Sequence, residues 1–98
     1  MRRAAKVDSN QEIIVQALRD AGAMVLSLAA VGKGVPDLLI SINGRLALME
    51  IKDGSKVKSK QKLTEAQVRW HAAWADCPVS IVDGVEAALR HLKVLRGP

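Results

Sequence analysis

Hydrophobic residues recur along the chain with two different periods, and these periods predict its helices and strands. A spacing of three and four residues predicts a helix over 9–21, whose apolar face carries Ile13, Ile14 and Leu18. Continuous runs of Val, Leu and Ile predict strands, namely 23–30, 35–42, 45–52 and 79–82. Helical patterns return over 64–75 and after residue 83. The predicted order is α-β-β-β-α-β-α, a single α/β domain over 1–98 with a mixed sheet flanked by helices.

Turn and capping residues mark the ends of these predicted helices and strands. Asn43-Gly44 separates two strand-like runs and is the strongest short signal for a two-residue hairpin. Thr64 and Gln67 have the spacing of a capping box at the start of a helix. The same spacing occurs in Ser9 with Glu12 and in Asp83 with Glu86, so we expect these residues to cap the first and last helices. We further expect Trp70 and Trp74 to be core or subunit-interface anchors and Cys77 to be a small buried residue.

The hairpin register brings two carboxylates together. With a two-residue turn, Ile42 pairs with Arg45, and the same register sets Asp37 opposite Glu50. Lys52 then shares their face, opposite Val35. Facing carboxylates repel each other, so the pair requires a cation. Lys52 supplies one positive charge, and carboxylate oxygens also suit Mg²⁺.

Two interpretations of this pair are open. Asp37 and Glu50 could be ordinary solvated groups, with Glu50 and Lys52 forming a surface pair. Against this, both runs are otherwise apolar at positions of either face, where a charge is costly unless it serves a site. We therefore expect a functional site at these residues.

Composition and charge limit the classes of function and of binding partner that fit this chain. The chain has 98 residues with 49% hydrophobic residues, which suffices for one core, and two Trp without Phe or Tyr make that core aliphatic. A stacking platform for single-stranded nucleic acid, which needs several exposed aromatic residues, is therefore disfavoured. The net charge of +5 favours a polyanionic partner, and a single cysteine excludes an intrachain disulfide. No apolar run is long enough to span a membrane and no signal-peptide pattern is present, so we expect a cytoplasmic protein.

Positive charge gathers in two segments and one turn. An N-terminal arm and a lysine-rich loop account for most of it, and Lys33 lies between two glycines. We expect these residues to contact DNA phosphates: Arg2, Arg3, Lys33, Lys56, Lys58, Lys60 and Lys62. The alternative is a solvated loop and, for the glycines around Lys33, an ordinary turn.

The ordered set of motifs resembles a known nuclease signature. Gly34-Val35-Pro36-Asp37-Leu38 is followed after twelve residues by Glu50-Ile51-Lys52, and the pattern continues with Leu63-Thr64-Glu65-Ala66-Gln67. Together with the first helix and its Glu12, this resembles the VRR-NUC family of the PD-(D/E)XK nucleases, in its small stand-alone phage and bacterial form. The resemblance covers nearly the whole chain and implies a restriction-endonuclease-like core.

The resemblance implies metal-dependent hydrolysis of DNA phosphodiesters. Asp37, Glu50 and the main-chain carbonyl of Ile51 would bind Mg²⁺ or Mn²⁺, and Lys52 would orient or help deprotonate the attacking water. Gln67 would reach the site near Lys52. Glu12 would complete the metal site or its surroundings. For Gln67 and Glu12, helix capping is a competing explanation, and for Gln67 the two roles are compatible.

Stand-alone members of this family resemble Holliday-junction resolvases. A four-way junction is two-fold symmetric and needs two nicks, so we expect a homodimer that resolves branched DNA. A duplex nickase or a flap nuclease would use the same residues. A different class, a non-catalytic basic DNA-binding module, would bind DNA in a salt-sensitive way without cleaving it.

Overall fold

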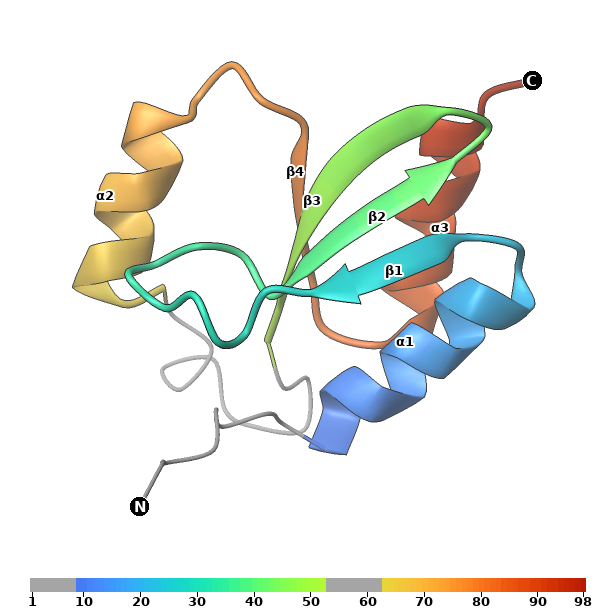
Figure 1. Cartoon of the computed structure of the whole chain (residues 1–98), viewed down its shortest axis with the longest axis horizontal. Helices are drawn as coiled ribbons and strands as arrows, with labels where there is room; N and C mark the ends of the chain where they lie inside the picture. The colour runs from blue at the N-terminus through green and yellow to red at the C-terminus, as the bar shows by residue number, and fades with distance from the viewer. Residues whose placement is uncertain (1–8, 53–62) are drawn as a thin grey trace.

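The computed structural model describes residues 9–52 and 63–98 of the chain (Figure 1). In these residues the chain forms three helices and one four-stranded sheet. The elements are α1 (Ser9–Asp20), β1 (Met24–Ser27), β2 (Leu38–Ile42), β3 (Arg45–Ile51), α2 (Glu65–Ala73), β4 (Val79–Val82) and α3 (Val85–Arg96). This confirms the predicted order α-β-β-β-α-β-α and the mixed α/β class.

The sheet has the strand order β1-β2-β3-β4, with β1, β2 and β3 antiparallel and β4 parallel to β3. Asn43 and Gly44 both have positive φ, 53° and 74°, as a two-residue type I′ turn requires. Ile42 pairs with Arg45, and this register continues unchanged to Leu38 opposite Met49. The predicted hairpin register is therefore confirmed, without a bulge in the turn.

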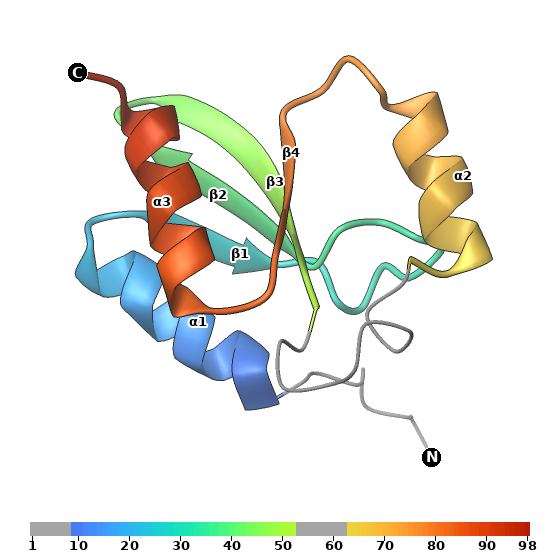
Figure 2. The same ribbon diagram turned by 180° about the vertical axis from the view of Figure 1, so that it is seen from behind.

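Helices α1 and α3 cover one face of the sheet (Figures 1 and 2). Alternate residues of β2 and β3 point toward these helices and are buried, as period two demands. The core is aliphatic, as predicted, and its most buried members are Ile14, Leu18, Leu38, Met49, Val82 and Ala88. Ile13 was expected on the same face of α1 but is 61% exposed, whereas Gln11 shares the buried face with Ile14 and Leu18.

Helix α2 stands apart from α1 and α3 and buries none of its own residues (Figures 1 and 2). Trp70 and Trp74 stack on each other with ring centroids 5.3 Å apart, and Trp74 is 51% exposed. The prediction of core tryptophans is therefore wrong, whereas the interface role stays a prediction. Cys77 is also exposed, because it lies in the connection that leads from α2 back to β4.

Three local predictions fail for identifiable reasons. Strand β2 begins at Leu38 and not at residue 35, since Pro36 has no N–H for a ladder hydrogen bond, so Val35 does not pair with Lys52. Helix α3 begins one residue later than expected, which leaves Gly84 as its N-cap in place of Asp83. Helix α1 already includes Ser9, so the predicted Ser9–Glu12 capping box is out of register with the helix start.

None of the helices within the described ranges is long and apolar enough to cross a membrane.

Two adjacent isoleucines of α1 provide a test of this packing. Ile14 is fully buried and Ile13 is 61% exposed, so truncation to alanine removes core contacts at only one of them. We expect Ile14→Ala to lower the free energy of unfolding by about 2–5 kcal/mol. Ile13→Ala should change it by less than about 1 kcal/mol. Urea unfolding of both variants measures the difference, and equal losses would contradict the placement of α1.

Candidate active site

Glu50 and Lys52 lie at the carboxyl end of β3, on either side of Ile51. Glu50 belongs to the strand face opposite α1 and α3, yet it is only 2% exposed. A carboxylate removed from water in an apolar strand needs a hydrogen-bond donor. Gln67 of α2 provides one, because its Nε2 donates to Oε2 of Glu50 over 3.1 Å.

The side chain of Gln67 also binds Lys52. Its Oε1 accepts a hydrogen bond of 2.8 Å from Lys52 Nζ, so one amide bridges the acid and the base of the Glu-x-Lys motif. The same oxygen accepts from the backbone N–H of Thr64 over 2.8 Å, and the Thr64 hydroxyl accepts from Gln67 N over 3.2 Å. These two bonds form the predicted capping box. Gln67 therefore combines the capping position with contact to both Glu50 and Lys52.

Asp37 lies just before β2, at the position that the hairpin register sets opposite Glu50. Its backbone does not form a ladder pair with Glu50, because the pairing of β2 with β3 ends at Leu38. Its carboxylate accepts a hydrogen bond of 2.8 Å from Ile51 N. Its main-chain carbonyl accepts from Leu28 N over 2.7 Å, which fixes Asp37 from the side of β1. Asp37 thus contacts the residue between Glu50 and Lys52, so the three polar residues of the motif meet at one end of the sheet.

The turn before Asp37 packs against the first turn of α2. Gly32, Lys33 and Gly34 all have positive φ, which favours glycine and explains both glycines as turn residues. A Cβ on Gly34 would collide with the carbonyl of Ala66 and lie 2.8 Å from Gln67 N. Close approach of the two backbones at Gly34 therefore supports the position of Gln67. Lys33 is exposed on this turn.

Glu12 is not joined to these residues. It is exposed on the first turn of α1, and within the described part of the chain no hydrogen bond or ion pair connects it to Asp37, Glu50 or Lys52. Its role in the site stays a prediction. The basic residues of the N-terminal arm and the lysine-rich loop lie outside the described residues: Arg2, Arg3, Lys56, Lys58, Lys60 and Lys62.

Two neighbours of Glu12 connect α1 to the sheet and were not predicted. Asn10 Nδ2 donates to the carbonyls of Lys52 and Asp83, each over 3.4 Å. Gln11 is 5% exposed, and its amide donates to Ser27 Oγ over 3.4 Å. Asn10 therefore links the start of α1 to the end of β3, beside the candidate site. The capping-box spacing indicates a role for Glu12. Hydrophobic periodicity gives no signal for Asn10 and Gln11, because their inward-facing side chains are polar.

The donor set is compatible with a magnesium-type ion. Asp37 and Glu50 supply carboxylate oxygens. In an extended strand the N–H and the carbonyl of one residue point to the same side. Because the N–H of Ile51 binds Asp37, its carbonyl also points toward Asp37. No cluster of three or more His, Cys, Asp or Glu side chains occurs among residues 9–52 and 63–98. Mg²⁺ is commonly bound by one or two carboxylates, with waters and substrate phosphate completing its shell. Softer ions that require His or Cys ligands do not fit this set.

Comparisons with known proteins give no independent assignment. No family model, curated protein or solved structure matches the chain. The resemblance to the VRR-NUC family therefore stays a prediction from the residues quoted above.

The glycine turn allows a test of how α2 is held. Gly34→Ala should displace α2 because the added Cβ collides with its backbone, whereas a Cβ on Gly32 meets open space. Both positions have positive φ, so Gly32→Ala controls for backbone strain. The only two tryptophans of the chain lie in α2 or at its end, so acrylamide quenching of their fluorescence reports on this helix. We expect altered quenching in Gly34→Ala alone, and indistinguishable quenching in the two variants would contradict the contact.

Proposed function

We propose that this chain is a metal-dependent, structure-selective DNA endonuclease that acts on branched DNA as a homodimer. The observation that carries the proposal is the bridge made by Gln67 between Glu50 and Lys52, beside Asp37. These four residues come from three separate segments of the sequence, and each is at a position that the nuclease signature assigns to its site. A fortuitous resemblance in sequence gives no reason for the four side chains to converge.

In the proposed reaction, water attacks the phosphorus atom of a DNA phosphodiester. The bond from phosphorus to the 3′ oxygen breaks as the new bond forms. The attacking water gives up one proton and the leaving 3′ oxygen takes one up, which yields a 5′-phosphate and a 3′-hydroxyl. A Mg²⁺ ion held by Asp37 and Glu50 would lower the pKa of a bound water and stabilise the charge that grows on the phosphate. The protein's own contribution is to hold these carboxylates and Lys52 in fixed positions.

Lys52 supplies the positive charge of the site. Its ammonium has three N–H donors and Gln67 accepts one of them, which leaves two for the attacking water or a phosphate oxygen. The bridging amide also fixes the position of Lys52 Nζ relative to the carboxylate of Glu50. A donor held in this way stabilises charge in the transition state without rearranging during the reaction.

The substrate is proposed from charge and symmetry. A net charge of +5 in 98 residues favours association with nucleic acid. The described residues of each chain form one candidate site, and a two-fold symmetric junction requires two nicks, so two copies complete the reaction.

Cleavage of labelled DNA tests the proposal directly. Purified protein is incubated with a four-way junction, a flap and a plain duplex in Mg²⁺, Mn²⁺ or EDTA. We expect metal-dependent, symmetric nicks in the junction, and a loss of at least about a hundredfold in rate for Asp37→Asn and Lys52→Ala, because each removes a group that acts in the transition state.

Two matched variants make the result specific. Asp76→Asn makes the same charge change at an exposed aspartate between α2 and β4 and should cleave normally. Thr64→Ala removes the hydroxyl of the capping box but leaves the amide of Gln67, so it should retain far more activity than Gln67→Ala.

Cleavage of only the flap or the duplex would support the active site but contradict the four-way junction as its substrate. Salt-sensitive binding without cleavage in either metal would contradict the enzyme and favour a DNA-binding module.

A further inference from the structure

Away from Glu50, the face of the sheet opposite α1 and α3 is apolar, and no helix of residues 9–52 and 63–98 packs on it (Figure 1). We call it the open sheet face and define it by five residues of β1, β2 and β3: Met24, Leu26, Leu39, Leu46 and Leu48. The register aligns them in rows across the strands, with Leu26 beside Leu39 and Leu39 beside Leu48. Met24 is 75% exposed, Leu26 58% and Leu46 60%.

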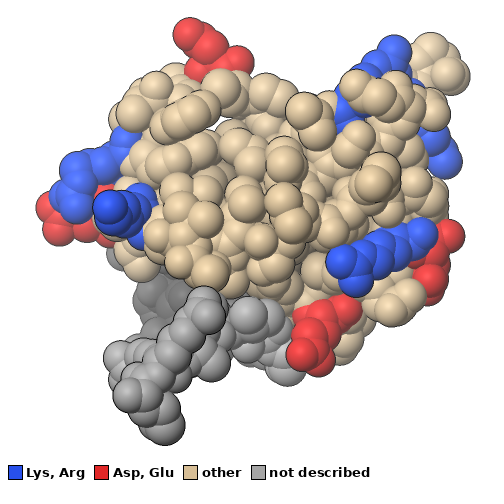
Figure 3. All heavy atoms as spheres, viewed as in Figure 1, with Lys and Arg blue, Asp and Glu red and all other residues tan. Residues whose placement is uncertain are grey.

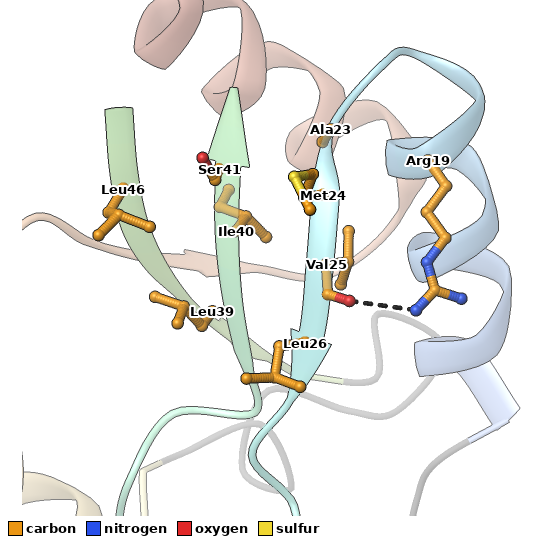
Figure 4. A pocket seen from close by; sticks show the side chains of 9 residues that line it. All are labelled: Arg19, Ala23, Met24, Val25, Leu26, Leu39, Ile40, Ser41 and Leu46. Carbon is orange, nitrogen blue, oxygen red and sulfur yellow. Dashed lines mark hydrogen bonds between the residues drawn. The ribbon is translucent and has the colours of Figure 1, made fainter. Parts of the chain in front are cut away.

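Side chains of the open sheet face line two hollows. The larger, of about 540 Å³, lies over β1 and β2, where Met24, Leu26, Leu39 and Leu46 surround it (Figure 4). The second, of about 210 Å³, is lined by Leu39, Leu46 and Leu48 together with Trp74 from the end of α2. Because Leu39 and Leu46 line both, the apolar surface runs without interruption from β1 to α2.

Charged side chains are absent from the centre of this face and lie around its margin (Figure 3). Arg19 is at the edge of the larger hollow, and its guanidinium donates to the carbonyl of Val25 over 3.1 Å (Figure 4). A surface that binds DNA needs cations along it, so DNA is a poor occupant here. An apolar centre depleted of charge inside a charged margin is the composition of a homodimer interface.

The extent of the surface also suits a second copy. Four large side chains on the open sheet face and beside it are more than half exposed, namely Met24, Leu26, Leu46 and, at the end of α2, Trp74. At roughly 100 Å² each, and with the half-buried leucines between them, they offer on the order of 600 Å² of apolar surface, close to the about 800 Å² that one partner contributes to a standard interface. Apolar patches of this size on soluble proteins mark interaction sites.

We propose that two copies of this chain associate through the open sheet face and Trp74, related by a two-fold axis. In such a dimer the same patch is used by both copies, so leucine rows meet leucine rows and the charged margins stay in water. The choice of a second copy as occupant rests on the proposed function, which requires two sites. The apolar character of the surface itself does not depend on that function.

Sedimentation of the full chain without DNA tests this proposal. We expect a dimer at micromolar concentration, and a dissociation constant at least about a hundredfold larger for Leu46→Glu, because two symmetric carboxylates lose water at the interface. Met24→Glu should act in the same way and serves if Leu46→Glu does not fold. Val94→Glu is the matched control, since Val94 is 77% exposed on α3, away from this face.

A monomer at all concentrations would overturn the proposal, as would a dimer that both Leu46→Glu and Met24→Glu leave as tight as the wild type. A dimer lost in Val94→Glu but kept in Leu46→Glu would place the interface on α3 and also overturn it. Because no step involves DNA, a dimer that fails to cleave any substrate would contradict only the proposed function. A junction-cleaving protein that stays monomeric would contradict the interface and the homodimer of the proposed function, but not its active site.

Discussion

The buried carboxylate of Glu50 is the constraint on which the arrangement of this site depends. Glu50 is 2% exposed in a strand whose other side chains are apolar, apart from the arginine at its start. Such a group is tolerated only if hydrogen bonds replace its lost hydration. The amide of Gln67 supplies one of these bonds and at the same time binds Lys52, so the acid, the base and α2 are fixed by a single side chain.

This constraint gives α2 an unusual place in the fold. The helix buries none of its residues, so no hydrophobic core holds it against the sheet. Its position instead depends on polar bonds at its first turn and on the close approach of Gly34 to Ala66. Hydrogen bonds of this kind each contribute about 1 kcal/mol, far less than the burial of an apolar helix face. Formation of the site is therefore tied to the docking of one short helix.

Local sequence signals predicted the turn and the helix start that bring these residues together. The Asn43-Gly44 turn fixed the hairpin register, and that register alone set Asp37 opposite Glu50 and ahead of Lys52. The capping-box spacing of Thr64 and Gln67 likewise gave the start of α2. The position of Gln67 near Lys52 was expected from the resemblance and not from the cap. Such signals succeed because backbone conformation at a turn or a cap depends on residues only a few positions apart.

Tertiary contacts could not be predicted in the same way. Trp74 and Leu46 are apolar and were compatible with a core, yet both are more than half exposed, because periodicity shows which side chains share a face but not what covers that face. Gln11 and Asn10 were missed for the opposite reason, since their polar side chains face inward to bind particular groups of the sheet and of the β4–α3 connection. Asp37 does not form a ladder pair because Pro36 delays the start of β2 until Leu38.

The most direct measurement of the central claim is the binding of Mn²⁺ to the full chain without DNA, followed by electron paramagnetic resonance. The account predicts saturable binding that is lost in Asp37→Asn and in Glu50→Gln and unchanged in Asp76→Asn. Binding that persists in both substituted proteins, or that is absent from the wild type, would contradict the assignment of these two carboxylates to a metal site.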